Sequence, residues 1–423
     1  MRNWAATIIL ICSFVFSGYA QQDAKAIKEG EKYAEKAKKA FEKDDFEKAL
    51  QFYTEAINAN PLEENYYLNR GITYEYLSNE TAAIEDYTKG IELNPEHSLC
   101  YIERSHALLI LDDFHEAYND AMMHSKIHGE NDESLSRKKL TLLKLKEYEK
   151  AIPVISKIIE NDIEDPHLYL QRAKCYIETA NFNAANADIN KAIALGNDNG
   201  YDFYDIQGLY YLRKNEPRKS IDAYNKILIE TYAYTPLPES YYNCSNAFYA
   251  LGKLDSALIQ MNKALVKGSK PEYYLDRGSY LAEMGDLDNA LLDFNKAIEL
   301  APKLGAAYNN RAFYIWLPQS DYQKAVKDLT QVINFDPDNA YAYSNRSSAY
   351  LGLKDYENAF IDAFKSVELE PKNPYVYRTL ALLYSAIDEK DEAKNAAQGA
   401  LSWGLPTEGD PVFQNLMISL GLE

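Results

Sequence analysis

The histidines are the residues of this sequence best suited to metal chemistry. Five of the six lie between His97 and His128. His124 and His128 are four residues apart, which would place both on one face of a helix. Two imidazoles at this spacing can share an ion such as Zn²⁺. No cysteine or carboxylate clearly completes such a site, so we expect a surface-exposed pair, with no metal and no cofactor.

Motifs for catalysis are missing from the sequence. It contains no Gly-x-Ser-x-Gly turn, no phosphate-binding glycine loop and no His-Glu-x-x-His helix. We therefore expect a chain that is not an enzyme. Cys100, Cys175 and Cys244 are too scattered for a disulfide framework, and we expect them as small core residues.

Aromatic and amide side chains recur in the second half of the chain. Aromatic anchors beside adaptable hydrogen-bonding groups are typical of grooves that bind peptides or glycans. Ordinary packing between helices is the alternative explanation. Trp316 is expected to be an exposed anchor. The predicted binding residues are Tyr242, Asn243, Asn246, Tyr249, Asn309, Asn310, Phe313, Trp316, Tyr341, Asn345, Tyr375 and Arg378.

Composition bounds the partners of the chain. The 423 residues have a formal net charge of -19, which leaves no electrostatic footprint for nucleic acid. Such an acidic surface could attract basic partners, although solubility alone would also explain it. The hydrophobic fraction of 47% is ample for a buried core.

An internal repeat is the strongest pattern in the sequence. A phrase of the type Tyr67-Leu-Asn-Arg-Gly71 recurs at a period close to 34, followed by a phrase of the type Ala83-Ile-Glu-Asp-Tyr87 and often by a proline. Apolar residues within each repeat are spaced by three and four, which predicts amphipathic helices. The spacing slips by one residue near Ser320. The eleven expected repeats begin at Gly30, Glu64, Ser98, Asp132, Pro166, Tyr201, Pro238, Pro271, Gly305, Ala340 and Pro374.

These features resemble the tetratricopeptide repeat, and the resemblance covers about residues 30–405. It implies an all-α fold, a right-handed α-solenoid of about eleven helix-turn-helix repeats whose first helices line a concave groove. One repeat cannot bury its own apolar face, so the helical pairs must stack. The stretch Asp410 to Leu420 is expected to form a last helix that caps the apolar end.

Some tetratricopeptide domains hold a peptide's terminal carboxylate with a clamp of lysines, asparagines and an arginine. Asn69, Asn310 and Asn345 match the asparagine of that clamp. The basic partners do not match, so we do not expect this clamp here.

A second regularity links the two helices of a repeat. Six repeats carry Arg as their seventh residue, and the same six carry Asp sixteen or seventeen residues later. A partly buried guanidinium needs a carboxylate, so we predict an ion pair within each repeat, with a structural role. The pairs are Arg70–Asp86, Arg104–Asp120, Arg172–Asp188, Arg277–Asp293, Arg311–Asp328 and Arg346–Asp362.

The amino-terminal residues are typical of a secretory signal. Arg2 precedes a charge-free apolar run from Trp4 to Phe16, and Ala20 ends a short stretch of small residues. We expect a signal peptide over 1–20, a linker over 21–29, the solenoid over 30–404 with a softer joint near 230–239, and a capping helix over 405–423. The mature chain should not span a membrane.

The sequence therefore favours an interaction scaffold for a protein or peptide in the periplasm or cell envelope. The alternative is a soluble receptor for a small ligand, a glycan or peptide, with an aromatic pocket in the C-terminal repeats. The identity of the partner and the oligomeric state are open.

Overall fold

A computed structural model describes residues 24–228 and 235–422. These residues form helices joined by short turns, and no strand occurs among them. None of the described helices is long and apolar enough to cross a membrane. The expected signal peptide lies outside the described residues, as do residues 230–234 of the expected softer joint. The first helix, at residues 24–41, includes residues 24–29 of the expected linker, which are therefore helical.

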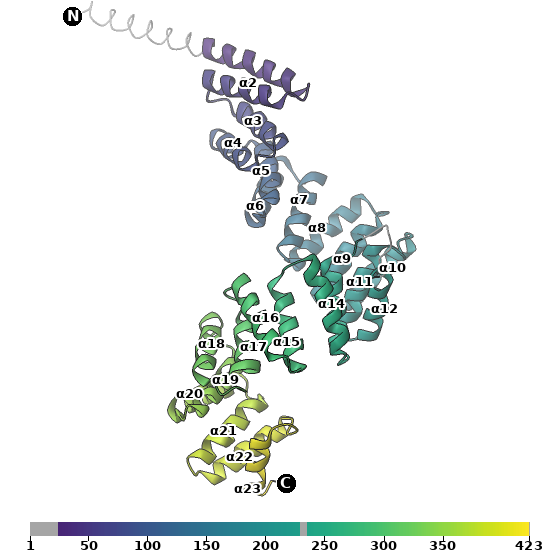
Figure 1. Ribbon diagram of the computed structural model, residues 1–423. Coiled ribbons are helices and arrows are strands. Elements are labelled where there is room, and N and C mark those ends of the chain that lie inside the picture. Colours follow the sequence, from purple (N-terminus) through teal and green to yellow (C-terminus); the bar gives the residue numbers. More distant parts are fainter. Residues whose placement is uncertain (1–23, 229–234, 423) are drawn as a thin grey trace, which may run out of the picture. The chain divides into compact units, whose positions relative to one another are not determined.

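The chain divides into two compact units, with the boundary after Ile206, inside α11 (Tyr201–Arg213). In the described part of the N-terminal unit (residues 24–206), each helix packs against the next (Figure 1). After the first helix, its elements are α2 (Phe46–Ala59), α3 (Glu64–Tyr76), α4 (Glu80–Leu93), α5 (Ser98–Ile110), α6 (Phe114–His128), α7 (Asp132–Lys144), α8 (Tyr148–Asn161), α9 (Pro166–Glu178) and α10 (Phe182–Ala194).

The described part of the C-terminal unit (residues 207–422) is built in the same way and ends on one additional helix. Its elements are α12 (Pro217–Leu228), α13 (Pro238–Tyr249), α14 (Leu254–Lys267), α15 (Pro271–Glu283), α16 (Leu287–Leu300), α17 (Gly305–Arg311), η1 (Ala312–Trp316), α18 (Tyr322–Phe335), α19 (Ala340–Gly352), α20 (Tyr356–Leu369), α21 (Pro374–Ala386), α22 (Lys390–Ser402) and α23 (Pro411–Ser419).

The predicted repeat frame is confirmed. From Glu64 onward, every expected repeat start is the first residue of a helix. Small residues explain the close pairing of the two helices of a repeat: the alanines that open the second helices, such as Ala83 and Ala290, are fully buried. At Gly71, an added Cβ would lie 2.5 Å from the Tyr87 ring, so that any larger residue would push the helices apart.

The turn inside each repeat has a backbone conformation that we did not predict from the sequence. One residue per turn adopts positive φ, and in most repeats it is not glycine: Ala180 has φ 57° and Lys354 has φ 59°. The next residue is often Asp or Asn, whose side chain caps the second helix. Asn181, for example, accepts a hydrogen bond from the backbone N–H of Ala184.

The slip near Ser320 corresponds to a π-helical turn. Element η1 directly continues α17, and the N–H of Leu317 bonds to the carbonyl of Ala312, five residues earlier. One extra residue is thus absorbed inside the first helix of that repeat without breaking it.

The expected capping helix is present as α23, which packs against α21. Phe413 is fully buried there, within a cluster that includes Leu380 and Leu405. Cys100, Cys175 and Cys244 are buried free thiols, as expected of core residues.

Candidate functional site

The predicted ion pairs hold the first helices in place. In all six repeats, the arginine donates two hydrogen bonds to its aspartate; Arg172 does so to Asp188 at 2.8 and 2.7 Å. The aspartate side chains are only 4–7% exposed. Burial raises the pKa of Asp120 even though Arg104 opposes the shift. These pairs are the predicted structural element of the repeat.

Each arginine also has a third partner, which the sequence analysis missed. Its remaining nitrogen, Nη1, reaches back to the second helix of the preceding repeat, where Thr, Ser or Asn occupies the matching position. Arg172 Nη1 donates to Ser156 Oγ at 2.9 Å, and Arg346 Nη1 donates to Thr330 Oγ1 at 3.0 Å. The pair therefore joins neighbouring repeats as well as the two helices of one repeat.

The candidate site is a groove of about 960 Å³ in the C-terminal unit. Its walls come from α15, η1, α19 and α21, and the segment that leads into α23 also lines it. Four of the predicted binding residues line it: Phe313, Asn345, Tyr375 and Arg378. Phe313 and Tyr375 are 45% and 43% exposed, so both rings are accessible to a partner.

The polar groups of this groove are partly engaged with each other. Arg378 donates two hydrogen bonds to Asp410, from Nε to Oδ2 and from Nη2 to Oδ1, the second at 3.0 Å. Burial acts to raise the pKa of Asp410, but the hydrogen bonds from Arg378 and from the Phe413 N–H, together with the charge of Arg378, lower it overall. Asp410 also caps α23 by accepting a bond from the N–H of Phe413. Ser348 and Thr379 share a hydrogen bond of 2.7 Å between α19 and α21.

The remaining predicted residues do not line this groove: Tyr242, Asn243, Asn246, Tyr249, Asn309, Asn310, Trp316 and Tyr341. Several of them bond across neighbouring first helices instead. Tyr242 donates to Asp276 at 2.7 Å, and Asn246 accepts a bond from Tyr280 at 2.6 Å. Burial first, and then Asp276, raises the pKa of Tyr242.

Trp316 is half-buried rather than an exposed anchor. Its indole N–H donates to Asp328 at 2.8 Å, and the ammonium of Lys324 lies 4.6 Å from the centre of its ring. The Trp316 side chain, which we expected to face a partner, is therefore hydrogen-bonded to the Arg311–Asp328 ion pair. Asn310 and Asn345 likewise donate to Ser279 and Asn309, at 3.1 Å each.

Other residues of the groove escaped the sequence analysis. Leu317 and Pro318 follow the π-helical turn, while Leu405 and Pro406 come from the approach to α23. The slip in repeat spacing near Ser320 was the one signal that could have marked the first two. Leu405 and Pro406 follow the C-terminal turn of α22, where the N–H of Leu405 bonds to the carbonyl of Ala400.

The described part of the chain does not gather the histidine pair into a metal site. The rings of His124 and His128 are 5.5 Å apart, but His124 is buried, and its Nδ1 bonds to the carbonyl of Ser98. The expectation of two surface histidines is therefore wrong for His124. A different group, Glu75, Glu103 and His106, places three possible ligand atoms within 4.8 Å of one another.

Comparison with known proteins places these repeats in a family. Models described as "Tetratricopeptide repeat" match residues 64–97, 271–304 and 317–374. The first match spans α3 and α4, and the second spans α15 and α16, so that each covers one helical pair. The chain is a tetratricopeptide repeat protein.

Curated relatives include DnaJ homolog subfamily C member 3 of Gallus gallus, 25% identical over 340 residues, or 76% of this chain and 63% of the relative. The Homo sapiens protein of that name is 25% identical over 342 residues, or 76% and 62%. The chain thus spans less than two thirds of the length of these relatives. Among solved structures, "Crystal structure of APC/C hetero-tetramer Cut9-Hcn1" matches with a TM-score of 0.52 and 13% identity, over 91% of this chain and 95% of that one, which supports the tetratricopeptide fold alone.

Proposed function

We propose that this tetratricopeptide repeat protein is a non-enzymatic scaffold that holds a segment of a protein partner in the groove of its C-terminal unit. The observation that carries the proposal is the groove itself. At about 960 Å³, it is large enough for several side chains of a peptide, and two accessible aromatic rings stand beside hydrogen-bonding groups in its wall.

The chemistry of the groove suits a peptide segment. Phe313 and Tyr375 can take apolar side chains, while Asn345 and Arg378 can bond to backbone carbonyls. The two charged groups that face each other, Arg378 and Asp410, form an ion pair. We therefore assign this pair to shaping the site and not to transferring a proton.

The proposal includes an extracytoplasmic location, in the periplasm or cell envelope. It rests on the pattern of residues 1–20, where a positive start, an apolar run and small residues follow one another.

Capture of a partner by matched variants tests the groove. The purified protein is immobilised and exposed to a cell-envelope extract, and bound proteins are identified by mass spectrometry. We expect the variant Phe313→Ser with Tyr375→Ser to lose one bound protein by roughly tenfold or more, because anchoring rings carry much of the energy of an interface.

The control variant, Leu292→Ser with Ile361→Ser, alters two exposed apolar residues on second helices outside the groove. It should retain the same protein. Equal capture by both variants would refute a role for this groove. If no protein depends on the groove but a glycan raises the Tm of the unaltered chain and not of the groove variant, the small-ligand receptor would replace the scaffold.

A further inference from the structure

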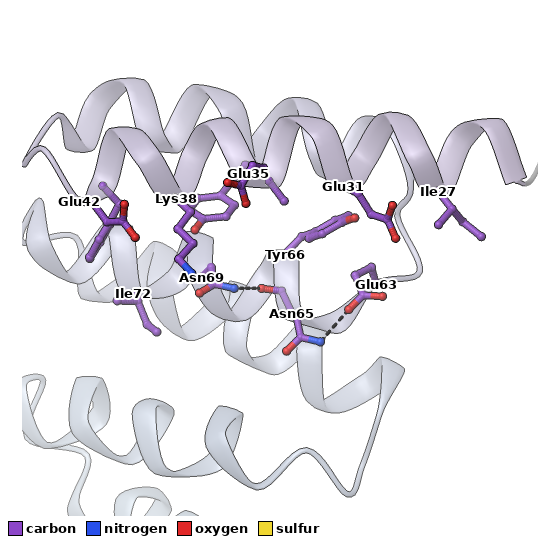
Figure 2. Close-up of a pocket in the computed structure, with 13 residues that line it drawn as sticks. Ile27, Glu31, Glu35, Lys38, Glu42, Glu63, Asn65, Tyr66, Asn69 and Ile72 are labelled. Carbon is purple, nitrogen blue, oxygen red and sulfur yellow. Dashed lines mark hydrogen bonds between the residues drawn. The ribbon is translucent and has the colours of Figure 1, made fainter.

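A separate groove lies within the N-terminal unit. It encloses about 730 Å³ between helix 24–41 and the beginning of α3. Figure 2 shows Glu31, Glu35 and Lys38 on the first helix, with Glu63 and Tyr66 on the opposite side. This groove shares no residue with the candidate site.

The interior of this groove offers apolar contact. Ile27 is 45% exposed, and Phe41 and Ile72 are half-buried. Tyr53 and Tyr66 add two buried rings to the lining. An aliphatic side chain that enters the groove would therefore lose its water-exposed surface against carbon atoms.

The charged side chains that line the groove are mostly acidic. Four carboxylates line it (Glu31, Glu35, Glu42 and Glu63), and among the described residues that line it Lys38 is the single basic one. Glu35 does pair with Lys39 at 3.2 Å, but both side chains are more than half exposed, so that water screens this pair.

Burial and this negative charge both raise the pKa values of the buried tyrosine hydroxyls. Burial first, and then Glu42, raises the pKa of Tyr53 to about 12. Burial, followed by Glu63 and Glu31, raises the pKa of Tyr66. A cation placed between these carboxylates would meet a favourable potential that low-dielectric walls strengthen.

The amide donors of the groove are engaged within the chain. Asn69 Nδ2 donates to the backbone carbonyl of Asn65 at 2.6 Å, and Asn65 Nδ2 donates to Glu63 Oε1 at 2.7 Å (Figure 2). A carboxylate ligand would meet repulsion from the glutamates and little compensation from these amides. The groove is therefore unsuited to an acidic ligand.

We propose that the N-terminal groove binds a basic segment of a protein partner, in which Lys or Arg residues alternate with aliphatic ones. The basic groups pair with Glu31, Glu42 and Glu63, and the aliphatic groups contact Ile27 and Ile72. This inference rests on the proposed scaffold role and extends it, because it assigns a partner of defined charge to a second groove.

A labelled peptide tests the proposal on the purified protein. The probe is a fluorescein-labelled peptide of repeated Lys-Leu units, and binding is followed by fluorescence anisotropy. We expect the variant Glu31→Gln, Glu42→Gln, Glu63→Gln to bind it about tenfold more weakly, since three partly exposed charge pairs are lost. Glutamine keeps an acceptor for Asn65. Rising salt should weaken binding to the unaltered protein.

The matched control removes three exposed carboxylates from second helices, in Glu55→Gln, Glu85→Gln, Glu160→Gln. Its affinity should stay within about twofold of the unaltered protein. Equal weakening by both variants would mean general attraction to an acidic protein, and would overturn the proposal. So would equal binding of a Glu-Leu peptide, or a dimer in solution that the groove variant abolishes, because a second copy would then occupy the groove.

The outcome is separable from that of the proposed function. Phe313→Ser with Tyr375→Ser leaves the N-terminal groove unaltered and should bind the Lys-Leu peptide normally. Loss of envelope capture with normal peptide binding would support both proposals. Normal capture by that variant together with normal peptide binding would reject the C-terminal groove alone.

Discussion

At the scale of single residues, the arginine of each Arg–Asp pair joins several parts of the structure. Arg172 bonds to Asp188 within its own repeat and to Ser156 in the repeat before. The tyrosine three residues earlier, Tyr169, lies with its ring centre 5.7 Å from the guanidinium carbon. A lysine offers one point charge and cannot reproduce this forked geometry.

Replacing Arg172 should therefore be costly. We expect Arg172→Ala to lower the free energy of unfolding by about 3 kcal/mol, because the carboxylate of Asp188 would remain buried without a partner. Ser156→Ala removes the bond that joins Arg172 to the preceding repeat, together with the bond from the Ser156 hydroxyl to the carbonyl of Ile152, and should cost about 1 kcal/mol. Urea unfolding followed by circular dichroism measures both changes. Arg218→Ala, at an exposed position, serves as the control; a loss at Arg172 no larger than at Arg218 would contradict the assigned role.

The site residues show which contacts could be predicted from the sequence and which could not. The pairing of Arg with Asp could be predicted because both residues are present or absent together in each repeat. The position of Trp316 could not, because its indole partner Asp328 lies on the following helix, and only the packed structure brings the two together. Tyr242 and Asn246 were predicted to be available to ligands, but both bond to the neighbouring α15.

At the scale of helices, the repeat frame was readable because tyrosine, alanine and proline return at fixed positions. The positive-φ residue of a turn could not be predicted where it is Ala180 or Lys354, because neither side chain favours that backbone conformation. The π-helical turn at η1 appeared in the sequence only as a one-residue slip, because the wider turn takes up the extra residue.

The docking of α23 should become less stable at acidic pH. The pKa of Asp410 is lowered in the folded chain, so its ionised form stabilises the fold at any pH above the ordinary aspartate pKa of about 3.9. That contribution is lost as the pH falls through the lowered value. Asp410→Asn keeps a capping acceptor for Phe413 but has no charge to lose.

We therefore expect unaltered protein to exceed Asp410→Asn in stability by a constant margin at neutral pH, and the margin to shrink below about pH 4. Urea midpoints measured from pH 2 to pH 7 would show this. A margin that stays constant throughout the acid range would contradict the assignment.

At the scale of the whole molecule, the stacked pairs account for nearly all of the described chain, and they carry two grooves of different chemistry. The N-terminal groove is acidic and the C-terminal groove is aromatic with a paired Arg378 and Asp410. The location of the second groove depended on where α23 docks, which repeat periodicity alone could not predict.

The compartment of the protein has a direct test. If residues 1–20 are a secretory signal, the protein isolated from its native cells should begin at Gln21. N-terminal sequencing or intact mass spectrometry gives the answer. Recovery of a chain that still carries residues 1–20 would reject cleavage at this point.

The arginine bonds to preceding repeats are unevenly distributed around the C-terminal groove. Arg277, Arg311 and Arg346 each reach back to the repeat before them. The last repeat has Leu380 at the corresponding position and lacks such a bond. The helices α15, α17 and α19 are thus each held to the preceding repeat by a guanidinium group, whereas α21, which carries Tyr375, is joined to α19 through the neutral Ser348–Thr379 hydrogen bond. We therefore expect α21 to shift more readily than the other first helices when partner side chains of different size enter the groove.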